Sequence, residues 1–204
     1  AAACCEILGD LFDEMPDRDD LSDPMIREAL FAGLSADTGW FRFSNTTPHT
    51  HELAARLIRA GVDQAELYGK LEQSARIEKL GLLIRALDSL ERLADDTAAL
   101  MVLRASDFEQ TGALPEETEH IVDIPRMVGS VQTVALITEP PAVNGSTGPI
   151  RVSFRSKPGD GAVNVAELAQ RFGGGGHARA AGAKVDAALD EVVGRVREAL
   201  AGGR

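Results

Sequence analysis

Four consecutive glycines followed by a histidine, Gly173 to His177, form the segment of this sequence most suited to chemistry. Glycines lose more backbone entropy on folding than other residues, so the run is not expected to serve packing. They permit positive φ and let neighbouring N–H groups converge on an anion. The run therefore predicts a phosphate-binding loop beside the His177 imidazole. A flexible linker is the alternative, although linkers rarely separate an amphipathic helix from a strand.

Positive charge gathers near this run. Arg155 ends a segment, 150–155, in which apolar and polar residues alternate, so Phe154 is expected to face the core and Arg155 to face outward. The planar guanidinium of an arginine can hold two phosphate oxygens, and Ser156 and Lys157 are expected to add a hydroxyl and a second charge. Between residues 151 and 184, six basic residues occur with two acidic ones, in a chain of net charge −11. Such an island favours a compact anionic ligand over a long nucleic acid, with a chance cluster as the alternative.

The elements that carry these residues can be predicted from apolar periodicity and from capping residues. Asp23 is placed to cap a helix that starts at Pro24, and Asp63 is placed to cap a later helix. Short apolar, β-branched runs predict strands. The expected helices cover residues 1–12, 25–36, 48–60, 75–93, 163–172 and 186–200, and the expected extended segments cover 40–43, 98–103, 131–138, 150–155 and 183–185.

The composition narrows the class of protein. Hydrophobic residues make up 44% and charged residues 26% of the chain, as in globular proteins. The sequence has no apolar stretch of about 18 residues, which a membrane-spanning helix would need. It also has no basic segment followed by an apolar one, which is the pattern of a secretory signal. Cys4 and Cys5 are adjacent and cannot form a long-range disulfide. We therefore expect a cytoplasmic protein that makes no membrane contact.

Several short motifs, in order along the chain, resemble one known family. They are Val152-Ser-Phe-Arg-Ser-Lys157, Asn164-Val-Ala-Glu-Leu-Ala169 and Phe172-Gly-Gly-Gly-Gly-His-Ala-Arg-Ala-Ala-Gly182. Through them, about the last half of the chain resembles the DHHA1 domain of the DHH phosphoesterases. It is most similar to the branch of bifunctional oligoribonucleases that also remove the 3′-phosphate from phosphoadenosine phosphate. Residues 32–46 resemble the last metal-binding motif of the DHH domain.

The resemblance implies an α/β fold with two domains. Residues 1–73 would form the C-terminal part of a metal-binding DHH domain, and residues 74–93 a linker helix. Residues 94–204 would form a DHHA1 domain with a mixed β-sheet and flanking helices. The resemblance also implies a set of residues that bind substrate phosphate: Arg155, Gly174, Gly175, Gly176 and His177.

A metal site is implied by the same resemblance. An Asp at the position of Asp37 ligates catalytic Mn²⁺ in the family, whereas an Asp-Thr-Gly segment taken alone is typical of a helix cap or turn. Two metal ions about 4 Å apart can activate a water and neutralise developing charge, and carboxylates suit Mn²⁺ or Mg²⁺. The Asp-His-His motif that names the family is absent from this sequence, and Asp37 is the one residue that matches a metal ligand. We therefore expect part of the metal domain to be missing and little or no hydrolysis by this chain alone. The side chains of His49, His51 and His120 are expected to be solvated.

The expected function of the whole protein is manganese-dependent hydrolysis of short oligonucleotides and of 3′-phosphoadenosine 5′-phosphate. One alternative is a phosphodiesterase that acts on cyclic dinucleotides or related phosphate esters. Another is a non-catalytic nucleic-acid-binding module, because related DHHA1 domains occur in alanyl-tRNA synthetases. The expected partners are short oligonucleotides or nucleotides, and a homodimer is left open.

Overall fold

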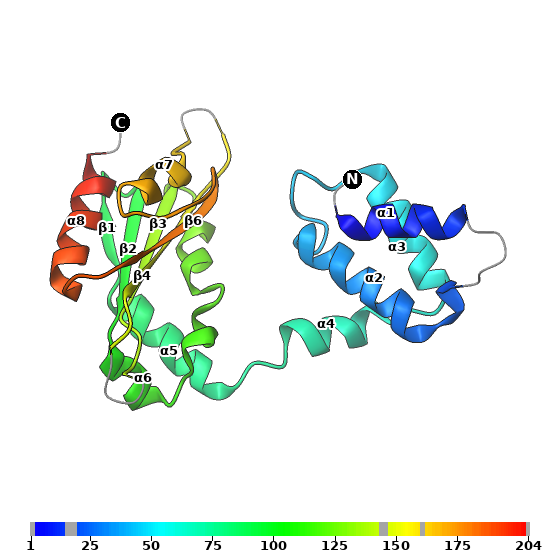
Figure 1. Cartoon of the computed structure of the whole chain (residues 1–204), viewed down its shortest axis with the longest axis horizontal. Helices are drawn as coiled ribbons and strands as arrows, with labels where there is room; N and C mark the ends of the chain where they lie inside the picture. Colours follow the sequence, from blue (N-terminus) through cyan, green and yellow to red (C-terminus); the bar gives the residue numbers. More distant parts are fainter. Residues whose placement is uncertain (1–2, 15–19, 143–146, 160–161, 203–204) are drawn as a thin grey trace. The chain divides into compact units, whose positions relative to one another are not determined.

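The computed structural model describes residues 3–14, 20–142, 147–159 and 162–202 (Figure 1). The chain divides into two compact units, Ala1–Ala75 and Arg76–Arg204. Among the described residues, no helix combines the length and the apolar character needed to cross a membrane.

The first unit is built of helices in its described part. Asp23 accepts a hydrogen bond from the N–H of Met25 at 2.8 Å, and Asp63 accepts from Ala65 and Glu66 at 3.0 and 2.9 Å. Both predicted N-caps are thereby confirmed. The elements of this unit are α1 (Cys4–Asp13), η1 (Asp20–Ser22), α2 (Pro24–Asp37), α3 (Pro48–Arg59) and α4 (Gln64–Glu72), around a core that includes Phe31, Leu34, Leu53 and Leu57.

A left-handed turn follows α2, so the extended segment expected at 40–43 is wrong. Gly39, Trp40 and Phe41 have φ values of 55°, 56° and 64°. The Thr38 hydroxyl donates to the carbonyl of Leu34 at 2.7 Å and accepts from the N–H of Phe41 at 3.2 Å. These local bonds hold the turn, and its aromatic rings pack back on Phe31 instead of entering a sheet.

The second unit is a six-stranded mixed sheet with helices on both faces. The strand order is β1-β2-β3-β4-β6-β5; β2 and β3 are parallel, and all other neighbours are antiparallel. This confirms the expected α/β class. The elements are α5 (Ile77–Asp88), β1 (Glu91–Leu93), β2 (Ala98–Leu103), α6 (Ala105–Thr111), η2 (Pro115–Thr118), η3 (Ile121–Met127), β3 (Thr133–Thr138), β4 (Ile150–Ser156), α7 (Val165–Gln170), β5 (Gly175–His177), β6 (Ala180–Val185) and α8 (Leu189–Ala201).

The two faces of the sheet have separate cores. On the α7–α8 face, Val152 and Phe154 of β4 pack with residues of α7 and α8, and Figure 1 shows α8 (red) alongside β1 and β2. On the α5–α6 face, Met101 of β2 and Leu136 of β3 pack with residues of α5, α6 and η3. The helices on this second face therefore cover β2 and β3.

The expected linker helix over 74–93 is shorter than predicted and belongs to the second unit. Leu82 and Ala86 of α5 are buried in the core of the α5–α6 face. The helix ends at Asp88, and the Ser89 hydroxyl then bonds to the carbonyl of Ala86 and accepts from the N–H of Val102. The next residues pair with β2 as β1. Apolar periodicity continues through residue 93, but pairing with a distant strand ends the helix.

Candidate functional site

The glycine run does not form the expected nest of converging amides. Gly173 has φ 74°, and its N–H bonds to the carbonyl of Gln170 at 3.0 Å. The N–H of Gly174 bonds to the carbonyl of Ala169 at 3.0 Å. This pair of bonds is a Schellman motif, in which a left-handed glycine ends a helix. Two of the amides that were expected to bind phosphate therefore terminate α7.

Packing explains two of the remaining glycine positions, contrary to the expectation from sequence. A Cβ at Gly174 would overlap the carbonyl oxygen of Gly182 and the side chain of Ala183. A Cβ at Gly176, where φ is 143°, would lie 2.6 Å from the carbonyl oxygen of Ala180. Both contacts arise because the chain after α7 runs close against β6. The glycines thus let β5 pair at the edge of the sheet.

His177 and Arg155 are brought to the same face of the sheet by strand register. Arg155 of β4 lies directly opposite Ala180 of β6, and Ala180 lies directly opposite His177 of β5. Directly opposite residues in an antiparallel pair point to the same face. Adjacent strands lie about 4.8 Å apart, so the two backbones are separated by about 10 Å with one methyl group between them. A phosphate held from both sides fits this row.

Within the described chain, the β5–β6 part of this face is uncovered, and η3 borders it at β4. The main neighbours of β6 are β4, β5 and α7, and α7 lies on the opposite face with Phe154. His177 is exposed and the side chain of Arg155 is 31% exposed, whereas Phe154 is fully buried. The expected outward orientation of Arg155 is confirmed. Because β5 is an edge strand, alternate backbone N–H groups of the glycine run also face away from the sheet.

Arg155 is held by a carboxylate that sequence reasoning missed. Its Nε lies 3.8 Å from Oδ1 of Asp123, and its Nη1 donates to the carbonyl of Phe154 at 3.0 Å. Asp123 also binds Nη1 of Arg126 at 2.6 Å and lies 3.7 Å from Nδ1 of His120. Two arginines thus share one carboxylate, and Nη2 of Arg155 has no partner among the described residues. No local motif marks Asp123, because η3 reaches β4 only through the tertiary fold.

The expected contribution of the Ser156 hydroxyl to this site is wrong, whereas that of the Lys157 charge stays a prediction. Ser156 is fully buried, and its hydroxyl donates to the carbonyl of Val163 at 2.8 Å. The Lys157 ammonium donates to the carbonyls of Val128 and Gly129 at 2.6 and 3.3 Å. The Ser156 side chain therefore fixes a loop on the buried side of β4, and the Lys157 side chain fixes the loop that follows η3.

Asp37 lies in the first unit, exposed at the last residue of α2. The pKa of the Cys5 thiol on α1 is raised, first by burial of the thiol and second by the negative charge of the Asp37 carboxylate. Within the described part of the chain, no three His, Cys, Asp or Glu residues are grouped so that they could hold a metal ion. The described residues therefore do not fit a complete site for Mn²⁺ or Mg²⁺, and Asp37 stays a predicted single ligand.

The histidines near α3 make contacts of their own. Nε2 of His49 lies 2.9 Å from Oδ1 of Asp10, which links the start of α3 to α1. The ring of His51 stacks on Phe41 with centroids 5.2 Å apart. Both residues are exposed, and these contacts account for their side chains without a metal.

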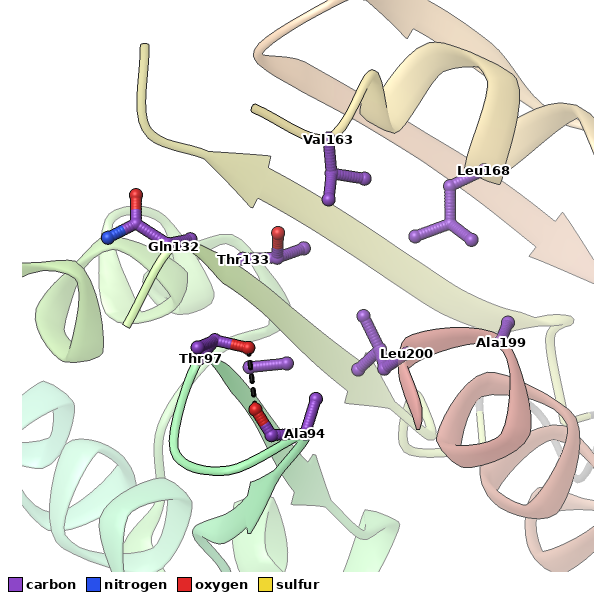
Figure 2. Close-up of a pocket in the computed structure, with 9 residues that line it drawn as sticks. Ala94, Thr97, Gln132, Thr133, Val163, Leu168, Ala199 and Leu200 are labelled. Carbon is purple, nitrogen blue, oxygen red and sulfur yellow. Dashed lines mark hydrogen bonds between the residues drawn. The ribbon is translucent and has the colours of Figure 1, made fainter. Parts of the chain in front are cut away.

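A pocket of about 230 Å³ lies on the other face of the sheet (Figure 2). It is lined by parts of β2, β3, α7 and α8 and has no charged side chain: its residues are Ala94, Thr97, Ala98, Gln132, Thr133, Val163, Leu168, Ala199 and Leu200. The dashed line in Figure 2 is the bond from the Thr97 hydroxyl to the carbonyl of Ala94 at 2.7 Å. Without a cation, this pocket does not suit a phosphate.

Comparison with known proteins identifies relatives of both units. Residues 97–202 match the DHHA1 domain family. The bifunctional oligoribonuclease and PAP phosphatase NrnA of Thermus thermophilus is 31% identical over 180 residues, which are 86% of this chain and 51% of that protein. The protein of the same name from Bacillus subtilis is 30% identical over 160 residues, which are 78% of this chain and 47% of that protein. The chain thus spans about half the length of the curated relatives it matches.

The fold has a counterpart among solved structures. An exopolyphosphatase-related protein from Bacteroides fragilis superposes with a TM-score of 0.76 at 23% identity, over 86% of this chain and 49% of that chain. At this level of identity the likeness concerns the fold.

Proposed function

Because the chain belongs to the DHHA1 domain family, we propose that it is the phosphate-binding part of a phosphoesterase. The whole protein would hydrolyse short oligonucleotides and 3′-phosphoadenosine 5′-phosphate, the activities for which the relatives from Thermus thermophilus and Bacillus subtilis are named. The observation that carries the proposal is the row formed by Arg155, Ala180 and His177 across three strands of an open sheet face.

The row suits a terminal phosphate for three reasons. Nη2 of Arg155, which has no partner among the described residues, can donate to phosphate oxygens and form a charge-assisted hydrogen bond. The His177 imidazole can donate from the opposite side, and the Ala180 methyl between them leaves room for the anion. These groups bind and orient the phosphate; they leave its hydrolysis to another part of the protein.

We assign that hydrolysis, as part of the same proposal, to a metal-binding domain to which Asp37 contributes one ligand. Mn²⁺, or Mg²⁺, would supply a polarised water and positive charge at the reacting phosphate. The remaining ligands would come from residues that correspond to the other half of the relatives. Asp37, Arg155, Gly174, Gly175, Gly176 and His177 stay the predicted site residues.

The proposal is tested by the binding of the dinucleotide pApA and of 3′-phosphoadenosine 5′-phosphate to the 204-residue chain, measured by isothermal titration calorimetry. Arg155→Ala and His177→Ala should each weaken both ligands. A hydrogen bond to a charged group contributes about 1.5–3 kcal/mol, so Arg155→Ala should reduce affinity by about tenfold to a hundredfold.

The control is Arg92→Ala, which removes one positive charge from β1 at the opposite edge of the sheet. It should leave both affinities within about twofold, because charges more than about 10 Å apart are largely screened at 0.1 M salt. Equal losses in Arg92→Ala and Arg155→Ala would show that only net charge matters and would contradict the proposed site.

A further inference from the structure

A second cationic row lies on the same open face, four residues along the strands from the first. Arg151 of β4 is directly opposite Lys184 of β6. Both side chains are exposed, and neither has a hydrogen bond or an ion pair within the described residues. Directly opposite side chains have Cβ atoms about 5 Å apart, and like charges in such a pair repel. Although the chain has 32 acidic residues against 21 lysines and arginines, no described acid neutralises this pair.

A bare row separates the two cationic rows. It consists of Ser153 of β4, Gly182 of β6 and Gly175 of β5, which are directly opposite one another in turn. A Cβ built at Gly175 would meet no atom within 4 Å, and its φ is not positive. Gly173, Gly174 and Gly176 are explained by a helix end and by close packing, whereas nothing within the described chain explains Gly175. Glycine in a strand often marks a site where a ligand approaches the backbone closely.

The distance between the two rows determines which kind of anion can contact both of them. Four residues along a strand span about 14 Å, so the rows of Arg155 and Arg151 lie that far apart. A mononucleotide cannot extend from one row to the other, whereas a short oligonucleotide can. The face between the rows carries no aromatic side chain on which a base could stack, so the contacts would be to the phosphate backbone and independent of base sequence.

We propose that Arg151 and Lys184 form a second phosphate subsite, and that Ser153, Gly182 and Gly175 form the floor over which an extended oligonucleotide strand passes. The first phosphate then lies between Arg155 and His177, and a later phosphate lies on Arg151 and Lys184. This inference rests on the proposed function, because it takes the row of Arg155 and His177 as the first subsite. The affinity of the open face would then increase with the length of the oligonucleotide.

The subsite is tested by comparing adenosine 5′-monophosphate, which has one phosphate, with the trinucleotide pApApA, which has three. In the unmodified 204-residue chain, pApApA should bind more tightly than the monophosphate. The double variant Arg151→Ala/Lys184→Ala should weaken pApApA by about tenfold and leave the monophosphate within about twofold. It should also reduce the slope of log affinity against log salt by about 0.7, the value for one phosphate contact on a single strand.

Gly175 gives an independent test of the floor. Gly175→Val should leave the unfolding temperature unchanged, because its side chain enters open space, and should weaken pApApA more than the monophosphate. Gly194→Val is the matched control, since Gly194 on α8 also has no atom within 4 Å of a built Cβ. It should not change the binding of either ligand.

The outcomes separate this inference from the proposed function. If Arg151→Ala/Lys184→Ala and Gly175→Val leave pApApA binding unchanged, or weaken both ligands equally, the second subsite is wrong while the first can stand. If Arg155→Ala and His177→Ala leave the binding of both ligands unchanged, or the unmodified chain binds neither ligand, the proposed function itself is wrong.

Discussion

The four glycines of the run have three different physical roles, although they look alike in the sequence. Gly173 ends α7 in a left-handed conformation, and Gly174 and Gly176 allow close packing against β6. Gly175 faces open space and has no positive φ. Sequence reasoning identified the run as special but could not assign these roles, because the close contacts depend on residues of β6 that the pattern does not place.

Two alanine substitutions distinguish the packed glycine from the open one. Gly174→Ala should destabilise the chain by about 1–3 kcal/mol, since overpacking would force β5 away from β6. Gly175→Ala should be neutral, or should stabilise by about 0.4–1 kcal/mol through a smaller entropy of the unfolded chain. Urea unfolding followed by circular dichroism measures both changes. A stability loss in Gly175→Ala as large as that in Gly174→Ala would show that the whole run is packed.

Among the charged residues, alternation along one strand was enough to orient Arg155 but not to identify its partners. Arg155 faces outward because Phe154 enters the core, as the pattern of residues 150–155 predicts. Lys157 follows the last residue of β4, and alternation along the strand does not show that its ammonium binds the carbonyls of Val128 and Gly129. Asp123 comes from η3, and its approach to Arg155 depends on how η3 packs on β3 and β4.

At the scale of elements, the locally encoded features were predicted and the non-locally encoded ones were not. Asp23 and Asp63 cap their helices as expected. The strands β2, β3 and β4 lie within about two residues of their expected positions. By contrast, β1 was assigned to a helix and β5 to a loop, because each has three residues and pairs with a strand that its local sequence pattern does not identify.

The packing of α1 on α2 leaves no room for a Cβ atom at Gly33. A Cβ at this position would overlap Sγ of Cys5. Gly33→Ala should therefore destabilise the first unit by about 1–3 kcal/mol, although alanine favours the helix by about 1 kcal/mol over glycine. In a Cys5→Ala background the overlap is absent, so the same substitution should be neutral or stabilising. Trp40, the only tryptophan, lies in this unit and reports its unfolding by fluorescence.

Measuring Gly33→Ala in the unmodified chain and in the Cys5→Ala background shows whether contact with Cys5 causes the loss of stability. If Gly33→Ala costs the same stability in the unmodified chain and in the Cys5→Ala background, the effect does not come from contact between α1 and α2. Ala32→Gly is a useful control, because it makes the reverse change at the neighbouring position of α2 and should cost about 1 kcal/mol in either background.

For the molecule as a whole, the proposed phosphate-binding residues and the predicted metal ligand lie in different units, and the sequence analysis also assigns them to different domains. Every residue of the two cationic rows lies in the second unit, and Asp37 lies in the first. The proposed phosphate-binding face consists of residues of β4, β5 and β6, all of which lie in the second unit. A metal site is not complete in the described residues of either unit. Binding and hydrolysis should therefore be separable in this chain.

The last prediction follows from that division. The 204-residue chain should bind pApApA but should not cleave it, with or without added Mn²⁺, because one carboxylate cannot hold the two ions of the expected metal site. Chromatography of the reaction products tests cleavage, and calorimetry in the same buffer tests binding. Asp37→Asn should leave pApApA affinity unchanged, whereas Arg155→Ala should reduce it. Cleavage that depends on Mn²⁺ and is lost in Asp37→Asn would instead mean that this chain assembles a metal site around Asp37, with ligands that its described residues do not bring together.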